Sequence, residues 1–211
     1  MVVGLFLFAF GIVVTIKANI GYAPWDVFHV GLANTIGLSI GTVSILVGII
    51  IGIIVVLFGE KIGFGTVLNV ILIGIFIDVL LYIDIIIIPD NLIYGIAMLI
   101  IGLFIISLGT FFYIKSGFGA GPRDSLMVVV TRRTKIHVGI CRSILELLVT
   151  VFGWLLGGMV GIGTVISVIG IGFCIQITFK VLNFDIAAVK HESFYDSFTA
   201  IKKILSKKTA N

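Results

Sequence analysis

Charged residues, proline and cysteine are all scarce in this chain of 211 residues. Only 11% of the residues are charged, whereas soluble domains average about 25%, so an ordinary soluble domain is excluded. The chain has three prolines and two cysteines. Cys141 and Cys174 lie in separate apolar segments without the close spacing of a metal or redox motif. We therefore expect two buried, reduced thiols.

Long apolar runs make up most of the chain. Hydrophobic residues account for 60% of it, and the mean hydropathy is +1.31. Most of residues 2–182 fall into runs close to the length of a transmembrane helix, which is about 20 residues. We predict an all-α fold, a polytopic transmembrane bundle with the lipid bilayer as its main partner. Six spanning helices are expected, at residues 2–16, 38–58, 64–82, 92–114, 136–156 and 163–182.

One ten-residue pattern occurs twice. Residues 17–26 read KANIGYAPWD and residues 115–124 read KSGFGAGPRD, so that lysine, glycine, proline and aspartate coincide at an offset of 98. Further matches at this offset need no gap and include residues 63–67 with 161–165. Lysine, proline and aspartate are too scarce here for a chance match. The sequence predicts a duplicated three-helix unit, with repeat 1 at about 2–84 and repeat 2 at about 92–182.

The number of spans decides how the two repeats insert. Three spans per repeat is an odd number, so the repeats would have opposite orientations. One side of the membrane then receives Lys61, Lys115, Arg132 and the lysine-rich tail, and the positive-inside rule makes this side and both termini cytoplasmic. An alternative with four spans per repeat and parallel repeats remains open, although it needs short segments to cross the bilayer.

Each copy of the pattern leads into a short segment that begins at Pro24 or Pro122. Proline is favoured in the first turn of a helix, because its missing N–H has no helical partner there. Asp26 and Asp124 follow where the helix dipole favours negative charge. A helix over residues 24–36 would be roughly 19 Å long at about 1.5 Å per residue, and the bilayer midplane is about 15 Å deep. We predict two re-entrant half-helices whose N-termini meet near the midplane.

The candidate site lies where these N-termini would meet, because discontinuous helices at the midplane form transporter solute sites. Glu146 is added because ionisable residues inside spans usually face the bundle interior, and Arg142, one turn earlier, can pair with it. The candidate substrate-binding residues are Pro24, Trp25, Asp26, Pro122, Arg123, Asp124 and Glu146. Simpler interpretations remain open, in which each aspartate only caps its own helix and Arg142 reaches the cytoplasmic interface with Glu146.

Other polar residues have simpler roles. His29 is expected to make a local hydrogen bond rather than relay protons, Asn69 to line the interior and Asp78 to reach the outer interface. The Gly-x-Gly-Thr elements at residues 63–66 and 161–164 are expected to be tight helix starts. No group of potential ligands has metal spacing, and no nucleophile stands with a base, so we expect no metal, no cofactor and no enzyme.

The polar tail, residues 183–211, has its own pattern. Ser193 and Asp196 resemble a capping box, and Phe194, Phe198 and Ile201 then recur at helical spacing among lysines. This pattern predicts an amphipathic helix that binds anionic lipid head groups. A disordered basic tail is the alternative.

Several stretches together resemble the YczE-like bacterial integral membrane proteins, which are similar to the wider YitT group. They are TIKANIGYAPWD at residues 15–26, GL at 31–32, TIGLSIG at 35–41 and GFGT at 63–66. The resemblance implies a location in the bacterial plasma membrane. It implies no settled activity and therefore no catalytic residues.

Two classes of function remain. The first is a secondary transporter or channel for a small solute or ion, with its site between the half-helices. The second is a membrane-embedded accessory or scaffold protein that acts through a cytoplasmic partner. The positive charge is explained by topology, so no nucleic-acid partner is expected, and the sequence names neither the solute nor an oligomeric state.

Overall fold

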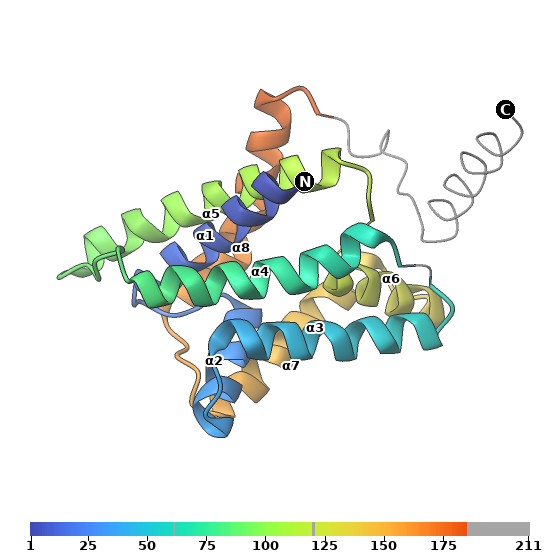
Figure 1. Cartoon of the computed structure of the whole chain (residues 1–211), viewed down its shortest axis with the longest axis horizontal. Coiled ribbons are helices and arrows are strands. Elements are labelled where there is room, and N and C mark those ends of the chain that lie inside the picture. The colour runs from blue at the N-terminus through green and yellow to red at the C-terminus, as the bar shows by residue number, and fades with distance from the viewer. Residues whose placement is uncertain (61, 120, 185–211) are drawn as a thin grey trace, which may run out of the picture.

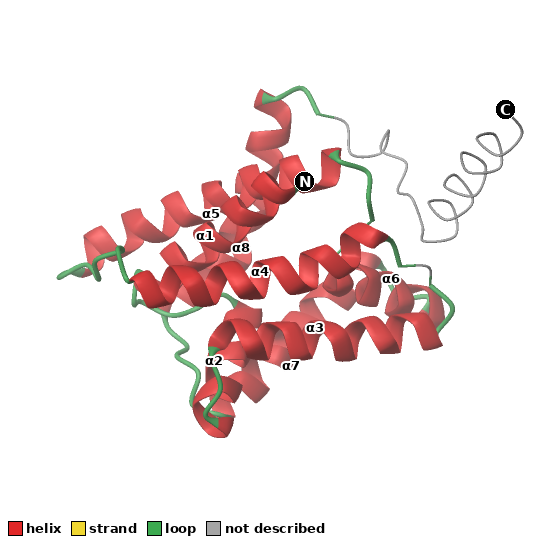
Figure 2. Ribbon diagram, viewed as in Figure 1, coloured by secondary structure: helices red, strands yellow, loops and turns green. Residues whose placement is uncertain are grey.

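The computed structural model describes residues 1–60, 62–119 and 121–184, which form eight α-helices and no β-strand (Figure 2). The helices are α1 Val2–Lys17, α2 Pro24–Ile36, α3 Ile40–Leu57, α4 Phe64–Ile83, α5 Leu92–Lys115, α6 Pro122–Thr134, α7 Val138–Leu155 and α8 Ile162–Val181. The all-α prediction is confirmed within these residues. The helices at the six predicted spans (α1, α3, α4, α5, α7 and α8) begin and end within two residues of the predicted boundaries.

Proline and backbone geometry explain the ends of the two short helices. Pro24 and Pro122 stand in the first turns of α2 and α6, as predicted. α2 ends at Gly37, whose φ of 71° lies in the left-handed region that favours glycine. α6 ends at Lys135, which has a φ of 58°. Both helices have 13 residues, so neither can cross a bilayer alone.

α1 and α5 cross at the centre of one layer, where they run antiparallel (Figure 1). A Cβ atom added to Gly4 would lie 2.9 Å from the carbonyl oxygen of Gly109. A Cβ atom added to Gly11 would lie 2.8 Å from the carbonyl oxygen of Gly102. The two backbones therefore touch, as small residues allow in membrane helices. α4 packs against α1, and α8 packs against α5.

The remaining four helices form the second part of the fold. α2 packs against α7, and α6 packs against α3. Ala33, Val43, Val55 and Val129 belong to the buried cluster between α2, α3 and α6. On the outer faces many apolar side chains are more than half exposed, among them Ile50, Ile53, Leu147 and Phe173. Such surfaces suit contact with lipid rather than water.

Four of the described helices are long and apolar enough to cross a membrane, namely α3, α4, α5 and α8. A fifth crossing results if α6 and α7, which lie at 120° to each other, form one broken span. α1 has only 16 residues and is short for a full crossing. Length and composition thus support four or five spans, and the predicted six are not confirmed.

The amphipathic helix predicted in the tail, which would start near Ser193, lies outside the described residues, which end at Phe184. Phe184 packs edge-on against Phe111 of α5 and Phe179 of α8, with ring centroids 5.0 and 5.1 Å apart. The division into residues 1–182 and 183–211 stays a prediction.

Replacing Gly11 with alanine is expected to destabilise the fold by about 1–3 kcal/mol, the usual cost of overpacking. The new Cβ would lie 2.6 Å from Ile106 Cγ1 and 2.7 Å from Ile106 N, so α1 and α5 would have to separate. Thermal unfolding of the detergent-purified protein, followed by circular dichroism, measures the effect. Gly52→Ala in α3 is the matched control, because its Cβ would meet no atom within 4 Å. Equal losses in both variants would contradict close α1–α5 packing.

Candidate functional site

A cavity of about 820 Å³ lies between the two parts of the fold, and all seven predicted site residues line it. Its lining includes several pairs of residues that are 98 positions apart, which we call counterparts. These pairs include Pro24 and Pro122, Trp25 and Arg123, Asp26 and Asp124, Ser44 and Arg142, Gly48 and Glu146, and Asn69 and Ser167. The two sequence repeats therefore contribute equivalent positions to one space.

The first turns of α2 and α6 meet through Arg123. Its guanidinium carbon lies 4.8 Å from the centre of the Trp25 ring, a cation–π distance. Its Nη2 atom lies 3.4 Å from Nδ1 and 3.5 Å from Nε2 of His29. The buried carboxylate of Asp26 is 3.9 Å from His29 Nδ1. One basic side chain from α6 thus faces an aromatic ring, an imidazole and a carboxylate from α2.

A second polar group surrounds the start of α6. The Tyr113 hydroxyl of α5 donates a hydrogen bond of 3.3 Å to Asp124 Oδ2. A Cβ atom added to Gly121 would lie 3.5 Å from Asp124 Oδ2, 3.7 Å from Asn69 Oδ1 and 3.8 Å from the Tyr113 hydroxyl oxygen. Oxygen atoms from α4, α5 and α6 therefore converge on one point; we call Asn69, Tyr113 and Asp124 the oxygen cluster.

Ion pairs satisfy the other charges of the cavity wall. Arg142 Nε donates to Glu146 Oε1 at 2.9 Å, so the predicted pairing is confirmed. Arg132 of α6 lies 2.5 Å from Glu60, which follows α3. The Ser167 hydroxyl is buried at the cavity and has no hydrogen-bond partner among the described residues.

Sequence reasoning missed Tyr113 and Ser167 as cavity residues, whereas the expectation for Asn69 is met. A usable signal was present for one of them. Asn69 and Ser167 are counterparts, and both are polar inside otherwise apolar helices. Tyr113 gave no such signal, because its counterpart is Thr15 and aromatic residues are common in apolar helices.

Backbone hydrogen bonds fix the extended segments that precede α2 and α6. The Gly163 N–H at the start of α8 donates to the Ile20 carbonyl at 2.8 Å, and the Gly65 N–H at the start of α4 donates to the Phe118 carbonyl at 2.8 Å. These two bonds are counterparts of each other. Each of the short helices α2 and α6 is therefore positioned by a Gly-x-Gly-Thr element of the other sequence repeat. In these elements the threonine hydroxyl accepts from the first glycine N–H, which confirms tight helix starts.

Helices α3 and α4 are in close backbone contact, and we call such a pair closed. Asp78 of α4 accepts hydrogen bonds from the Ser39 hydroxyl at 2.5 Å and from the Gly41 N–H at 2.7 Å, both at the start of α3. The backbones touch nearby, because a Cβ atom added to Gly74 would lie 2.5 Å from the Gly41 carbonyl oxygen. The same Cβ atom would lie 2.4 Å from Ile45 Cγ1. Asp78 thus binds the N-terminus of α3, a role that the sequence did not suggest.

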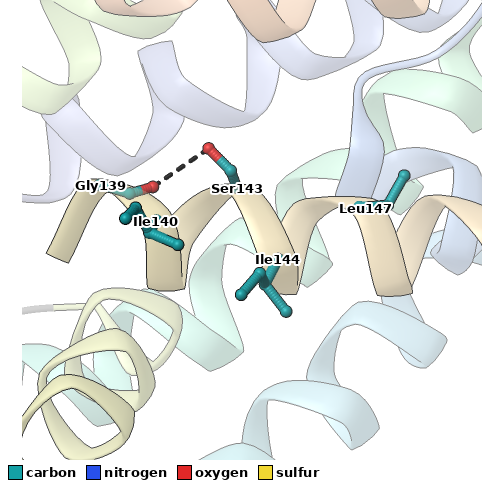
Figure 3. Close-up of a pocket in the computed structure, with 5 residues that line it drawn as sticks. All are labelled: Gly139, Ile140, Ser143, Ile144 and Leu147. Atoms are coloured by element: carbon teal, nitrogen blue, oxygen red, sulfur yellow. Dashed lines mark hydrogen bonds between the residues drawn. The ribbon is translucent and has the colours of Figure 1, made fainter. Parts of the chain in front are cut away.

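The counterpart pair α7–α8 is open. The two helices make hardly any contact, and a Cβ atom added to Gly172 would meet nothing within 4 Å. The Gly139 N–H donates within its own turn, to His137 Nδ1 at 3.3 Å. Figure 3 shows the resulting free face of α7, a pocket of about 260 Å³ lined by Gly139, Ile140, Ser143, Ile144 and Leu147. On α3 the counterparts of Gly139 and Ser143 are the residues that contact Gly74.

Comparison with known proteins identifies relatives of the same kind. The model of a family of unknown function, DUF6198, matches residues 1–180. The chain is 36% identical over 194 residues to the uncharacterized membrane protein YczE of Bacillus subtilis (strain 168), covering 87% of each chain. It is 32% identical over 167 residues to an uncharacterized protein of Haemophilus influenzae, covering 79% of this chain and 76% of that one. No solved structure matches. The resemblance to YczE-like proteins is thereby confirmed: the chain is a helical membrane protein that belongs to the DUF6198 family.

Proposed function

We propose that this protein is a secondary transporter of the bacterial plasma membrane, which moves a small solute through the central cavity by alternating access. In this proposal the two sequence repeats form inverted structural repeats with six spans. α2 and α6 are the re-entrant half-helices, and both termini are cytoplasmic.

The α1–α5 crossing supports the inverted arrangement. α1 and α5 occupy corresponding positions in the two repeats and run antiparallel. Gly4 touches Gly109, and the counterparts of these residues, Gly102 and Gly11, also touch each other. Exchanging the repeats therefore turns one contact into the other, which is the behaviour of a two-fold axis perpendicular to both helices. Such an axis lies in the membrane plane in transporters with inverted repeats.

The meeting of α2 and α6 supports the re-entrant interpretation. Trp25 and Arg123, the second residues of these helices, contact each other at the cavity. Two helices of 13 residues that start at a common point can return to opposite faces of the bilayer. Irregular backbone at such depth needs protein or a wet cavity around it, and the counterpart backbone bonds to α4 and α8 meet that need.

The observation that carries the proposal is the unequal packing of the counterpart pairs α3–α4 and α7–α8. If the repeats exchange conformations, a second state exists in which α7–α8 is closed and α3–α4 is open. Gly139 would then pack against Gly172, and Gln176, the counterpart of Asp78, would face the start of α7. The cavity would open alternately to the two sides. Two states that expose one site alternately to the two sides are what alternating access in a secondary transporter requires.

Replacing Gly172 with valine is expected to abolish transport while leaving the fold stable. The side chain has open space in the state described, but it would block the approach of α8 to α7. Uptake of labelled amino acids, organic acids and amines into proteoliposomes measures transport, and thermal unfolding measures stability. Gly52→Val is the matched control, since Gly52 also has open space but belongs to no interface. Unimpaired uptake by the Gly172 variant would contradict closure of α7–α8.

Asp78→Asn is expected to shift the protein toward the second state. Hydrogen bonds to a charged acceptor contribute about 1.5–3 kcal/mol, so weakening them changes the population ratio by roughly tenfold or more. The reporters are single cysteines at Ile45 and Ser143, in a chain that carries Cys141→Ala and Cys174→Ala. Maleimide labelling should rise at position 45 and fall at position 143. Labelling that rises at both positions would indicate unfolding instead, and unchanged labelling would exclude the two-state exchange.

A further inference from the structure

Arg123 lacks a carboxylate partner in the cavity. A guanidinium has five N–H donors, yet within the described residues no carboxylate oxygen lies within 4.0 Å of it. Its hydrogen-bond contacts among the described residues are the long ones to the two His29 nitrogens, at 3.4 and 3.5 Å. Its guanidinium carbon lies 4.8 Å from the centre of the Trp25 ring, a cation–π contact that helps to hold the side chain in place. A planar donor fork held in this way fits a carboxylate, which accepts two parallel hydrogen bonds.

The oxygen cluster offers the opposite chemistry. The exposed carboxyl group of Asp124 lines the cavity, and the oxygens of Asn69 and Tyr113 lie beside it. An ammonium group has three donors and no acceptor, so three converging oxygens suit it. No group of three His, Cys, Asp or Glu side chains in the described part of the chain could hold a metal ion instead.

The charge count selects between ligand classes. Asp26, Asp124 and Arg123 together carry a formal charge of −1. A simple anion would make this charge −2 in a cavity of low dielectric, which is unfavourable. A simple amine would leave the donors of Arg123 without an acceptor. A solute with both groups adds no net charge and supplies a partner for each.

We infer that the solute is a small zwitterion of the α-amino-acid type. Arg123 binds its carboxylate, and the oxygen cluster binds its amine. The inference rests on the proposed function, because it names the solute class of the same cavity. A volume of about 820 Å³ is within the range of small-molecule sites. Phe8, Ile12 and Ile73 on the cavity wall can receive an apolar side chain.

Binding is tested on the full chain in lipid nanodiscs. The variant Trp154→Phe leaves Trp25 as the only tryptophan, so its fluorescence reports a ligand at Arg123. The probes are alanine, valine, leucine, isoleucine, methionine and phenylalanine, each with the amine that lacks its carboxylate and the acid that lacks its amine. Calorimetry provides a second readout that does not depend on Trp25. At least one amino acid should bind saturably, at least tenfold more tightly than its amine and its acid.

Two substitutions test the carboxylate site at Arg123 and the amine site at the oxygen cluster separately. Arg123→Lys keeps the positive charge but removes the two parallel N–H donors of the guanidinium. It should therefore lower the affinity for the amino acid and for the acid at least tenfold and leave the affinity for the amine unchanged. Asp124→Asn should lower the affinity for the amino acid and for the amine and leave the affinity for the acid unchanged. Arg133→Gln is the control, because Arg133 is exposed over the Phe58 ring outside the cavity lining. It should change none of these affinities.

Three outcomes overturn the inference. They are an amine that binds as tightly as its amino acid, an acid that does so, or a stable protein that binds none of the probes. Different results would contradict the proposed transport function. Saturable binding of an amino acid without its uptake into proteoliposomes would leave the solute class standing and contradict transport. Uptake of another solute by a protein that binds no zwitterion would contradict the solute class alone.

Discussion

The fold depends on satisfying the backbone of the two extended segments that lead into α2 and α6. In an apolar bilayer no water is available for exposed N–H and C=O groups, so an irregular segment must find partners in the protein. Here the Ile20 and Phe118 carbonyls accept from glycine N–H groups at the starts of α8 and α4. Each half of the sequence therefore supplies a backbone partner to the extended segment that precedes the short helix of the other half.

Most ionisable side chains discussed above are also paired within the protein. The ionisable residues Glu60, Arg132, Arg142 and Glu146 are paired, and Lys17 pairs with Asp84. Unpaired charge inside a membrane is costly, so it is retained where it has a function. Arg123 has no carboxylate oxygen within 4.0 Å among the described residues, and Asp26 and Asp124 form no ion pair with a lysine or an arginine there. These three cavity residues therefore differ from the paired charges around them.

Sequence reasoning located the helices well because proline, glycine and apolar run length act locally. Pro24 and Pro122 start the short helices, and the seven candidate residues surround one cavity, because both halves carry the same local signals. The difference between α3–α4 and α7–α8 was not predictable. Gly41 and Gly139 match at the offset of 98, as do Gly74 and Gly172, so the pattern assigns both pairs the same packing. The difference in packing between the two pairs therefore arises outside this local pattern.

The contact between Trp25 and Arg123 has a consequence for how such a chain can arise. In the proposed inverted arrangement, Trp25 and Arg123 lie close to the two-fold axis, where a residue would meet its own copy if two identical units assembled. Two arginines at this point would repel, and two tryptophans would bring no positive charge. The cationic half of the cavity therefore needs an asymmetric pair, which a homodimer of single units cannot build. Covalent fusion of the units, followed by divergence at this one position, supplies it.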